Sequence, residues 1–293
     1  MSATDANSVR ARLFVALQYL LPQHLLSRLA YLITRSRVPL IKNALIRSFV
    51  DRFHPDMSEA AQPDPLKYES FNAFFTRALR APARPCDPDP AVLISPVDGS
   101  VSQIGRLEGS WLVQAKGHAY TLESLLAADL SWPAQLRGGA FATLYLAPSN
   151  YHRVHMPLSG VLRAAWYVPG ALFSVDATTT AGVPGLLARN ERVVCVFAHE
   201  ALSFAVVLVG ALLVGSMATV WHGEVTPRAL RGGADLPLDA ARAPLTLEKG
   251  AELGRFNMGS TVILLLPPGA SEWLSGLVPG SSVRVGQALA RLT

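Results

Sequence analysis

The stretch from Ala201 to Trp221 carries no charged side chain and would read as a transmembrane helix on hydropathy alone. Its many valines and its interior glycines instead favour two buried strands, Phe204 to Val209 and Leu212 to Val220, joined or bulged at the glycines. A spanning helix would also place the histidines upstream and Ser260 downstream on opposite sides of a membrane, and no credible second span brings the chain back. We therefore expect buried strands here, with an integral membrane protein as the alternative.

The composition is that of a folded chain. Its 293 residues are 50% hydrophobic and 16% charged, which excludes a disordered chain and allows a sizeable core. Cys86 and Cys195 are too few for a disulfide framework and show no metal-ligand spacing. We expect two ordinary thiols in a reduced, cytosolic setting.

Residues 6–50 combine positive charge with an apolar helical pattern. This segment has no Asp or Glu, and its basic residues are Arg10, Arg12, Arg28, Arg35, Arg37, Lys42 and Arg47. Its apolar residues recur at roughly helical spacing: Leu13, Phe14, Leu17, Leu20, Leu21, Leu25, Leu29, Leu32 and Ile33. The combination is typical of a helix lying in a membrane interface, where anionic lipid attracts a basic rim.

Other interpretations of this segment are less favoured. Pro22 should end one helix and begin another, and the uncharged stretch between Arg12 and Arg28 is shorter than the ~20 residues of a membrane span. No small-residue cleavage site of a secretory signal follows it. A helical hairpin packed on its own domain is the plain alternative. Nucleic acid is disfavoured, because no binding module accompanies the basic residues.

The rest of the chain indicates an α+β fold. A loop is expected over Pro55 to Pro65, a short amphipathic helix over Phe71 to Leu79, and a proline-rich linker over residues 81–90. From Val92 onward the pattern is of short β-rich runs, with one clear helical turn at Leu122 to Leu126. We expect a helical, membrane-associating region over 1–80 and a mainly β domain over 81–293. Glycine-turn segments near residues 98, 160 and 286 are similar to those of lipoyl or biotinyl carrier domains, so a barrel-sandwich fold is one option.

The Gly259-Ser260 pair precedes the apolar run Val262 to Leu266, so the serine should sit at the mouth of a strand. A glycine before it permits a tight backbone path that a side chain would block. Upstream, Asp98 lies in a turn, and His152 and His155 lie close together in the sequence. An aspartate that orients a histidine, which deprotonates a serine, is the usual means of activating a hydroxyl nucleophile.

With these segments in view, the chain resembles the bacterial, membrane-associated phosphatidylserine decarboxylases, which are self-processing pyruvoyl enzymes. The resemblance covers most of the chain and is carried, in order, by residues 71–77, 95–101, 114–118, 151–157, 167–175, 188–193, 209–216 and 254–261. One departure is Met258, where many members have leucine. The two side chains are similar in bulk, so we expect it to be tolerated.

The resemblance implies specific roles for the site residues. Asp98, His155 and Ser260 would form the processing triad: His155 takes the proton of Ser260, whose oxygen attacks the Gly259 carbonyl. Ser260 would then become the pyruvoyl cofactor, which decarboxylates phosphatidylserine to phosphatidylethanolamine through a Schiff base. His152 matches the position assigned to decarboxylation. Because residues three apart in a strand face opposite sides, either a turn near Tyr151 brings both histidines to the site or one has another role. The same spacing argues against a metal held by the two histidines.

The resemblance also implies the partners. Cleavage would give a large chain 1–259 and a small, pyruvoyl-bearing chain 260–293, which form a heterodimer that could dimerise further. The substrate would lie in an anionic membrane, with the enzyme bound peripherally to the cytoplasmic face. Arg153 and Lys116 are weak candidates for phosphate or carboxylate contacts.

Two rival functions are considered for this chain. A serine hydrolase would employ Asp98, His155 and Ser260 on an external substrate, although Ser260 is not in a Gly-x-Ser-x-Gly elbow. A carrier module of lipoyl-like fold would need a lysine at a hairpin tip, which residues 256–261 do not supply.

Overall fold

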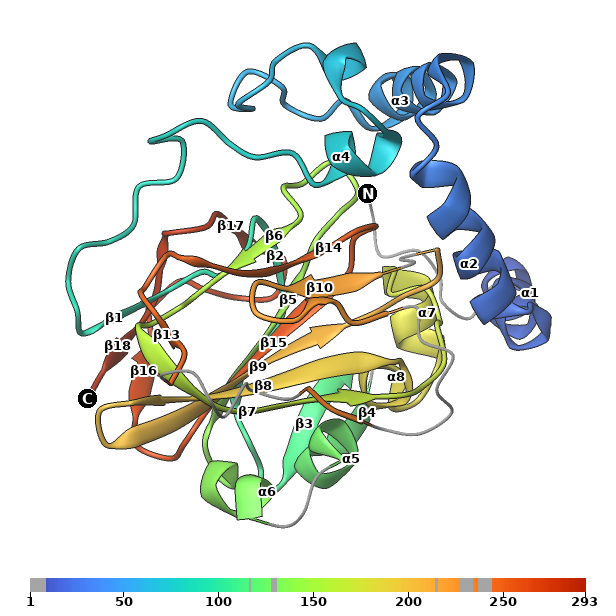
Figure 1. Ribbon diagram of the computed structural model, residues 1–293. Helices are drawn as coiled ribbons and strands as arrows, with labels where there is room; N and C mark the ends of the chain where they lie inside the picture. Colours follow the sequence, from blue (N-terminus) through green and yellow to red (C-terminus); the bar gives the residue numbers. More distant parts are fainter. Residues whose placement is uncertain (1–8, 116, 128–130, 214–215, 227–233, 237–243) are drawn as a thin grey trace.

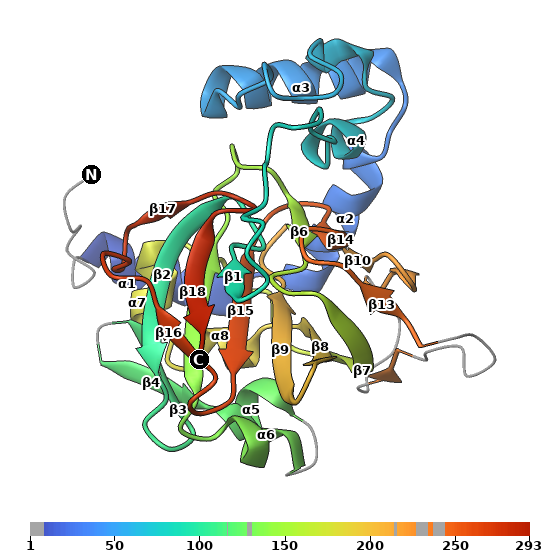
Figure 2. The same ribbon diagram turned by 90° about the vertical axis from the view of Figure 1, so that its left-hand side faces the viewer.

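The N-terminal region of the computed structural model is helical. The structure describes residues 9–115, 117–127, 131–213, 216–226, 234–236 and 244–293. The first helices are α1 (Val9–Leu20), α2 (Gln23–Thr34), α3 (Pro39–Phe53), the 3₁₀ turn η1 (Pro65–Lys67) and α4 (Phe71–Phe75). Figures 1 and 2 show α3 and α4 at one end of the β part, with α4 next to β6. Pro22 lies at the N-cap of α2, which confirms the predicted helix break.

The helix expected over Phe71 to Leu79 is shorter than predicted. It ends at Phe75, and the Thr76 N–H and side chain both bond to the Asn72 carbonyl. Beyond it, Leu79 forms an antiparallel bridge with Ala60, so tertiary pairing overrides the helical pattern. The proline-rich linker over 81–90 contains no helix or strand, as predicted.

One large sheet organises the β part. Among the described residues it has nine strands, and its neighbours are antiparallel. In spatial order they are β12 (Ala234–Asp235), β7 (Gly160–Val168), β8 (Arg192–His199), β9 (Leu202–Val209), β15 (Thr261–Leu266), β5 (Ala140–Tyr145), β2 (Gly99–Arg106) and β17 (Ser282–Val283), with β13 (Thr246–Leu247) also on β7.

Smaller sheets and helices cover the large one. One small sheet has the order β11 (Gly223–Glu224), β10 (Met217–Thr219), β14 (Glu252–Phe256), β6 (Arg153–His155). Another has the order β1 (Val92–Ile94), β18 (Ala288–Leu292), β16 (Ser271–Trp273), and β3 (Trp111–Ala115) pairs with β4 (His118–Thr121). Short helices complete the fold: α5 (Leu122–Leu126), α6 (Ser131–Leu136), α7 (Ala177–Gly182) and α8 (Leu186–Arg189). The fold class α+β is confirmed, and α5 matches its predicted turn.

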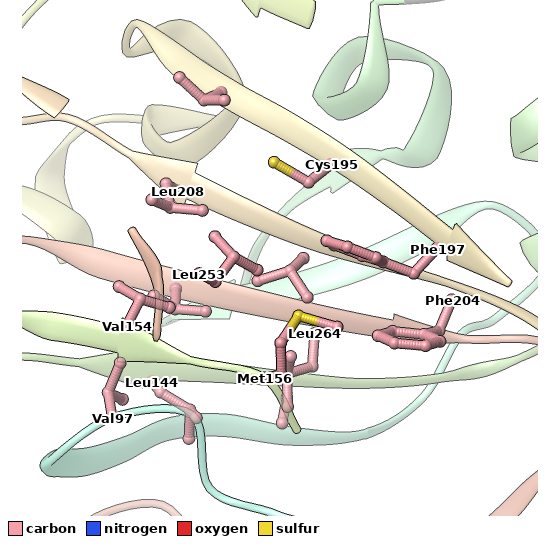
Figure 3. Packing of buried hydrophobic residues seen from close by; sticks show 14 of the residues in the cluster. Val97, Leu144, Val154, Met156, Cys195, Phe197, Phe204, Leu208, Leu253 and Leu264 are labelled. Atoms are coloured by element: carbon pink, nitrogen blue, oxygen red, sulfur yellow. The ribbon is translucent and has the colours of Figure 1, made fainter. Parts of the chain in front are cut away.

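The central strands are buried on both faces, which explains their unbroken hydrophobicity. In β9, Phe204, Val206 and Leu208 face one core, whereas Ala205, Val207 and Val209 face the other. Figure 3 shows the first of these cores, where side chains of the large sheet meet Val154 of β6 and Leu253 of β14. The period of two along a strand divides the apolar run between two cores.

The uncharged stretch 201–221 is therefore not a transmembrane helix, as predicted. It contains β9 and β10, which lie in different sheets. The second strand, β10, spans Met217–Thr219 and is shorter than the strand expected over Leu212 to Val220. Within the described residues, no helix is both long and apolar enough to cross a membrane.

Helices α1 and α2 are arranged with polar residues inward and apolar residues outward. Their buried side chains are polar: Gln18, Gln23, Ser27 and Thr34. Their large exposed apolar side chains are Val9, Leu13, Phe14, Leu17, Leu20, Leu25, Leu29, Leu32 and Ile33, with Leu20 exposed by 82%. This inverts the usual arrangement of a helix on a water-soluble domain. The two helices do pack on the β part, as in the plain alternative from sequence, but they do so through these polar side chains while most of their large apolar side chains stay exposed.

Candidate active site

The Gly259–Ser260 bond lies in the short connection between β14 and β15, at the mouth of a strand as predicted. Gly259 has a φ of +48°, in the left-handed region that glycine adopts without strain. A Cβ atom at this position would lie 2.9 Å from Nε2 of His152. Backbone conformation and the neighbouring ring therefore both require glycine before the serine.

Ser260 is buried but its hydroxyl is free. The residue is 2% exposed, and its carbonyl accepts a hydrogen bond from the Leu146 N–H at 2.8 Å. The Oγ atom has no hydrogen-bond partner among the described residues. A buried polar atom without a partner is uncommon, and here it is the hydroxyl that a nucleophilic role requires.

Three polar side chains hold the turn that leads into this bond. Asn257 donates from Nδ2 to Oγ of Ser216 at 2.6 Å, and its N–H donates to the Ser216 carbonyl at 2.9 Å. From α4, Nδ2 of Asn72 donates to the Asn257 carbonyl at 2.9 Å. Sequence reasoning assigned these residues no role, although all three lie inside the segments that carry the family resemblance.

An apolar pocket of about 330 Å³ opens beside Ser260. This volume is at the lower end of the range for small-molecule sites. Its lining comes from α3, from α4 and from four segments of the β part, residues 145–148, 174–176, 211–213 and 258–260: Phe49, Phe53, Phe75, Tyr145, Leu146, Pro148, Ser174, Val175, Asp176, Ala211, Leu212, Leu213, Met258, Gly259 and Ser260. The helical region and the β part thus build the site together.

His152 is the histidine beside the Gly259–Ser260 bond. It precedes β6, is fully buried, and its ring lies 4.0 Å from the ring of Phe75, centroid to centroid. Neither ring nitrogen has a hydrogen-bond partner among the described residues. Burial, reinforced by the positive charge of Arg77, lowers the pKa of His152 to about 3, against a weaker opposing effect of the Asn150 backbone. The imidazole is therefore neutral at pH 7.

Arg77 is itself buried close to His152. Its Nη2 donates to the Ser149 carbonyl at 3.2 Å, while Nε and Nη1 have no partner among the described residues. Burial lowers the pKa of Arg77, although the group stays charged at neutral pH. An incompletely paired guanidinium makes this part of the site strongly electropositive.

His155 is held in one orientation by two neighbours. Its Nδ1 donates to the Gly250 carbonyl at 2.7 Å, and this bond assigns the proton to Nδ1. In the neutral ring Nε2 then accepts from the Tyr151 hydroxyl at 3.0 Å. Burial lowers the pKa of His155, so the ring is a neutral base at pH 7.

Asp98 is held by Arg84 of the proline-rich linker. Nε of Arg84 donates to Oδ1 of Asp98 at 2.9 Å, and Nη2 donates to Oδ2. The Val285 N–H adds a bond to Oδ1 at 2.9 Å, and Arg84 also pairs with Glu59 at 2.8 Å. Arg84 and the Val285 N–H thus supply hydrogen-bond donors to both oxygens of the buried Asp98 side chain.

The structure brings some of the predicted site residues together more closely than others. His152 meets Gly259, and Phe256 N–H donates to the His152 carbonyl at 3.0 Å. Asp98 and His155 interact electrostatically, and the His155 N–H donates to Pro96 in the turn that carries Asp98. Within the described residues no hydrogen bond joins Asp98 to His155, or His155 to Ser260. The relay through these three residues stays a prediction.

The sequence indicated two weak candidates for phosphate or carboxylate contacts, Arg153 and Lys116. Arg153 is already paired, with Nη1 donating to Glu252 at 2.8 Å and Nε to the Thr76 carbonyl at 3.0 Å. Lys116 lies outside the described residues. Arg77, for which sequence reasoning proposed no role, is the cation whose charge contributes to the lowered pKa of His152. Its place in the matched segment 71–77 was the only signal for it.

The comparisons identify the class of protein. The profile of the phosphatidylserine decarboxylase family matches residues 71–291, and a second profile described as PSD matches residues 13–54. The chain is 53% identical to the phosphatidylserine decarboxylase proenzyme of Pseudomonas fluorescens strain Pf-5, covering 96% of this chain and 98% of that protein. It is 52% identical to the proenzyme of Stutzerimonas stutzeri (96% and 95% covered) and 50% identical to that of Azotobacter vinelandii (96% and 98%).

Each of the three relatives covers 96% of this chain and therefore both the helical region and the β part. The chain belongs to the phosphatidylserine decarboxylase family, which confirms the resemblance seen in the sequence.

Proposed function

We propose that this protein is a pyruvoyl-dependent phosphatidylserine decarboxylase that activates itself by cleaving the Gly259–Ser260 bond. It would remove the carboxyl group of the serine headgroup as CO₂ and leave phosphatidylethanolamine. The observation that carries the proposal is Ser260: a buried, unpartnered hydroxyl directly after a left-handed glycine, at the wall of an apolar pocket. The curated relatives, named proenzymes, support the self-processing part.

Cleavage begins with Oγ of Ser260. As its proton passes to a base, Oγ attacks the Gly259 carbonyl, the amide C–N bond breaks, and an ester with a free Ser260 amine results. Elimination then releases Gly259 as a carboxylate, and water replaces the Ser260 nitrogen, which leaves as ammonia. We assign the base to His155 and its electrostatic support to Asp98. His155 is neutral, and its Nδ1–H is already oriented by Gly250.

The residues present fit a pyruvoyl group at position 260. Oγ of Ser260 has no competing hydrogen bond within the described part of the chain, and the adjoining pocket is large enough for a headgroup. The pyruvoyl carbonyl supplies the electron sink that the substrate needs when CO₂ departs. His152, beside residue 259, is positioned to return a proton to the substrate carbon. The phosphate of an arriving lipid would raise the pKa of this ring, because a nearby anion favours imidazolium.

Both products of cleavage would remain in one folded unit. The small chain 260–293 contains β15, which pairs with β5 and β9 in the middle of the large sheet. It also contains β17, paired with β2, and β18, paired with β1 of the large chain. A heterodimer of chains 1–259 and 260–293 is therefore the expected mature form, with a further dimer left open.

The outward apolar face of α1 and α2 supports peripheral binding to a membrane. This face is basic at its edges and lacks acidic residues, which suits anionic lipid at the cytoplasmic face of the cell membrane. Phe53 of α3 and Leu213 are both partly exposed and line the Ser260 pocket. A phospholipid could thus place its headgroup in the pocket while its chains stay in the bilayer.

The intact mass of the purified protein tests the proposal. We expect two fragments meeting between Gly259 and Ser260, the smaller with a pyruvoyl-blocked terminus, and a single full-length chain for Ser260→Ala. The processed protein should convert phosphatidylserine to phosphatidylethanolamine with release of CO₂. A full-length wild-type chain after prolonged incubation at neutral pH would contradict self-processing and favour the serine hydrolase that shares these residues.

A further inference from the structure

The buried polar side chains of α1 and α2 hold two loops at the rim of the Ser260 pocket. The first loop, residues 172–176, and the second, residues 210–213, together supply six of the pocket-lining residues: Ser174, Val175, Asp176, Ala211, Leu212 and Leu213. Both loops lie far from the helices in the sequence. The contacts are therefore tertiary ones.

The first loop is held by two glutamines. Oε1 of Gln18 accepts from the Ser174 N–H at 2.8 Å, and Oε1 of Gln23 accepts from the Leu172 N–H at 2.7 Å. The two helices are linked to each other as well, since Nε2 of Gln23 donates to the Gln18 carbonyl at 2.7 Å. Gln18 is 1% exposed, so these bonds form without competition from water.

The second loop is held by Ser27, whose Oγ accepts from the Leu213 N–H at 3.1 Å. Leu213 has a φ of +64°, an unfavourable conformation for a leucine, so its surroundings must hold it there. Its side chain is 44% exposed and also lines the pocket. Asn190 joins the two loops from inside, because its Nδ2 donates to the carbonyls of Phe173 at 2.8 Å and Gly210 at 2.9 Å.

The same helices present their apolar side chains outward. Gln18, Gln23 and Ser27 accept hydrogen bonds from the loop N–H groups. A shift of α1 or α2 on a bilayer would therefore displace these acceptors together with the helix backbone. We propose that Gln18, Gln23 and Ser27 are positioning residues, through which α1 and α2 set the shape of the pocket rim that admits the phosphatidylserine headgroup. This inference rests on the proposed function.

The test compares Ser27→Ala with Ser27→Thr in the processed enzyme. Alanine removes the acceptor for Leu213, whereas threonine keeps it. We expect Ser27→Ala to raise KM for phosphatidylserine about fivefold with kcat changed less than twofold, the factor expected for a hydrogen bond of about 1 kcal/mol. Ser27→Thr should restore KM to within twofold of wild type. Gln18→Met, which keeps the shape and removes the acceptor, should resemble Ser27→Ala.

Two further measurements separate positioning from attachment. Ser36→Ala is the matched control, because among the described residues the Ser36 hydroxyl bonds only to the nearby Val38 N–H and Ser36 does not line the pocket. KM is measured both in anionic vesicles and with short-chain, water-soluble phosphatidylserine, and vesicle flotation is recorded for each variant. The increase in KM should appear with both substrates while flotation is unchanged.

The outcomes distinguish this inference from the proposed function. Unchanged KM in both Ser27→Ala and Gln18→Met, in an enzyme that cleaves itself and decarboxylates, would overturn the positioning role alone. An increase confined to vesicles, with flotation lost, would also overturn it, because the residues would then serve attachment. A wild-type protein that neither cleaves itself nor decarboxylates phosphatidylserine would contradict the proposed function instead.

Discussion

At the scale of single residues, Gly259 places the bond proposed for self-cleavage against the ring of His152. Its left-handed φ of +48° turns the chain into β15, and the space for a Cβ is taken by Nε2 of His152 at 2.9 Å. We expect Gly259→Ala to slow self-cleavage at least tenfold, because strain and the clash both displace the carbonyl that Ser260 attacks. The fragment ratio over time, measured by intact mass, checks this.

Gly269→Ala provides the control. Gly269 also has a positive φ, of +72°, but nothing lies within 4 Å of its Cβ position. It should show the strain of a left-handed alanine without altering cleavage. Equal slowing in the two variants would show that general destabilisation, and not the contact with His152, limits processing.

The second residue-scale prediction concerns His152 and pH. Its pKa is about 3 in the folded state and near 6.5 when unfolded, so the unfolded chain binds more protons between these values. Stability is therefore lost as pH falls below about 6.5, by about 3 kcal/mol at pH 4. Urea unfolding of Ser260→Ala, which stays uncleaved, should show this loss, and adding His152→Phe should remove most of it. An unchanged slope in the double variant would mean that His152 does not cause the loss.

The sequence predicted where the Gly259–Ser260 pair lies better than it predicted the hydrogen bonds of the site. The Gly259–Ser260 pair at a strand mouth follows from local pattern, because the glycine and the apolar run adjoin in the chain. The pairing of Asp98 with Arg84 does not follow from local pattern, since a charged residue in a proline-rich linker has many accessible partners. His155 likewise bonds to Gly250, and only the folded β6–β14 pairing places that carbonyl within reach.

At the scale of elements, β15 connects the site to the core. Successive residues of β15 face the two cores in turn, and the strand is paired on both sides. A cavity left by a truncated side chain of β15 therefore cannot easily be closed by movement of the strand. We expect Leu264→Ala to lower the free energy of unfolding by about 3 kcal/mol. Leu274→Ala, at a partly exposed site after β16, should change it by less than about 1 kcal/mol. Denaturant unfolding in the Ser260→Ala background measures both, and equal losses would contradict a central role for β15.

Element prediction succeeded where the local pattern was strong. The buried runs at 204–209 and 262–266 became β9 and β15, because an unbroken apolar run suits a strand with a core on each face. The short helices α7 and α8 were not predicted from the sequence. Each is too brief to show helical periodicity, and α7 depends on Asp176, whose Oδ1 caps the N–H groups of Thr178 and Thr179.

At the scale of the whole molecule, α1 and α2 face outward with apolar side chains and inward with the residues that hold the pocket rim. We expect the protein to float with vesicles containing anionic lipid and to bind neutral vesicles less well, because the basic residues add attraction that salt screens. Leu20→Glu with Leu25→Glu should lower the fraction bound at least tenfold. Both leucines are exposed, so the substitutions should leave the fold intact.

Val278→Glu tests whether an added negative charge weakens vesicle binding only when it lies on α1 or α2. Val278 is also an exposed apolar residue, but it lies in the loop between β16 and β17, outside the N-terminal helices. If α1 and α2 form the lipid-binding surface, this variant should float like wild type at every salt concentration. Equal loss in the helix and loop variants would indicate nonspecific binding, and the pocket would then have to receive a lipid extracted from the bilayer.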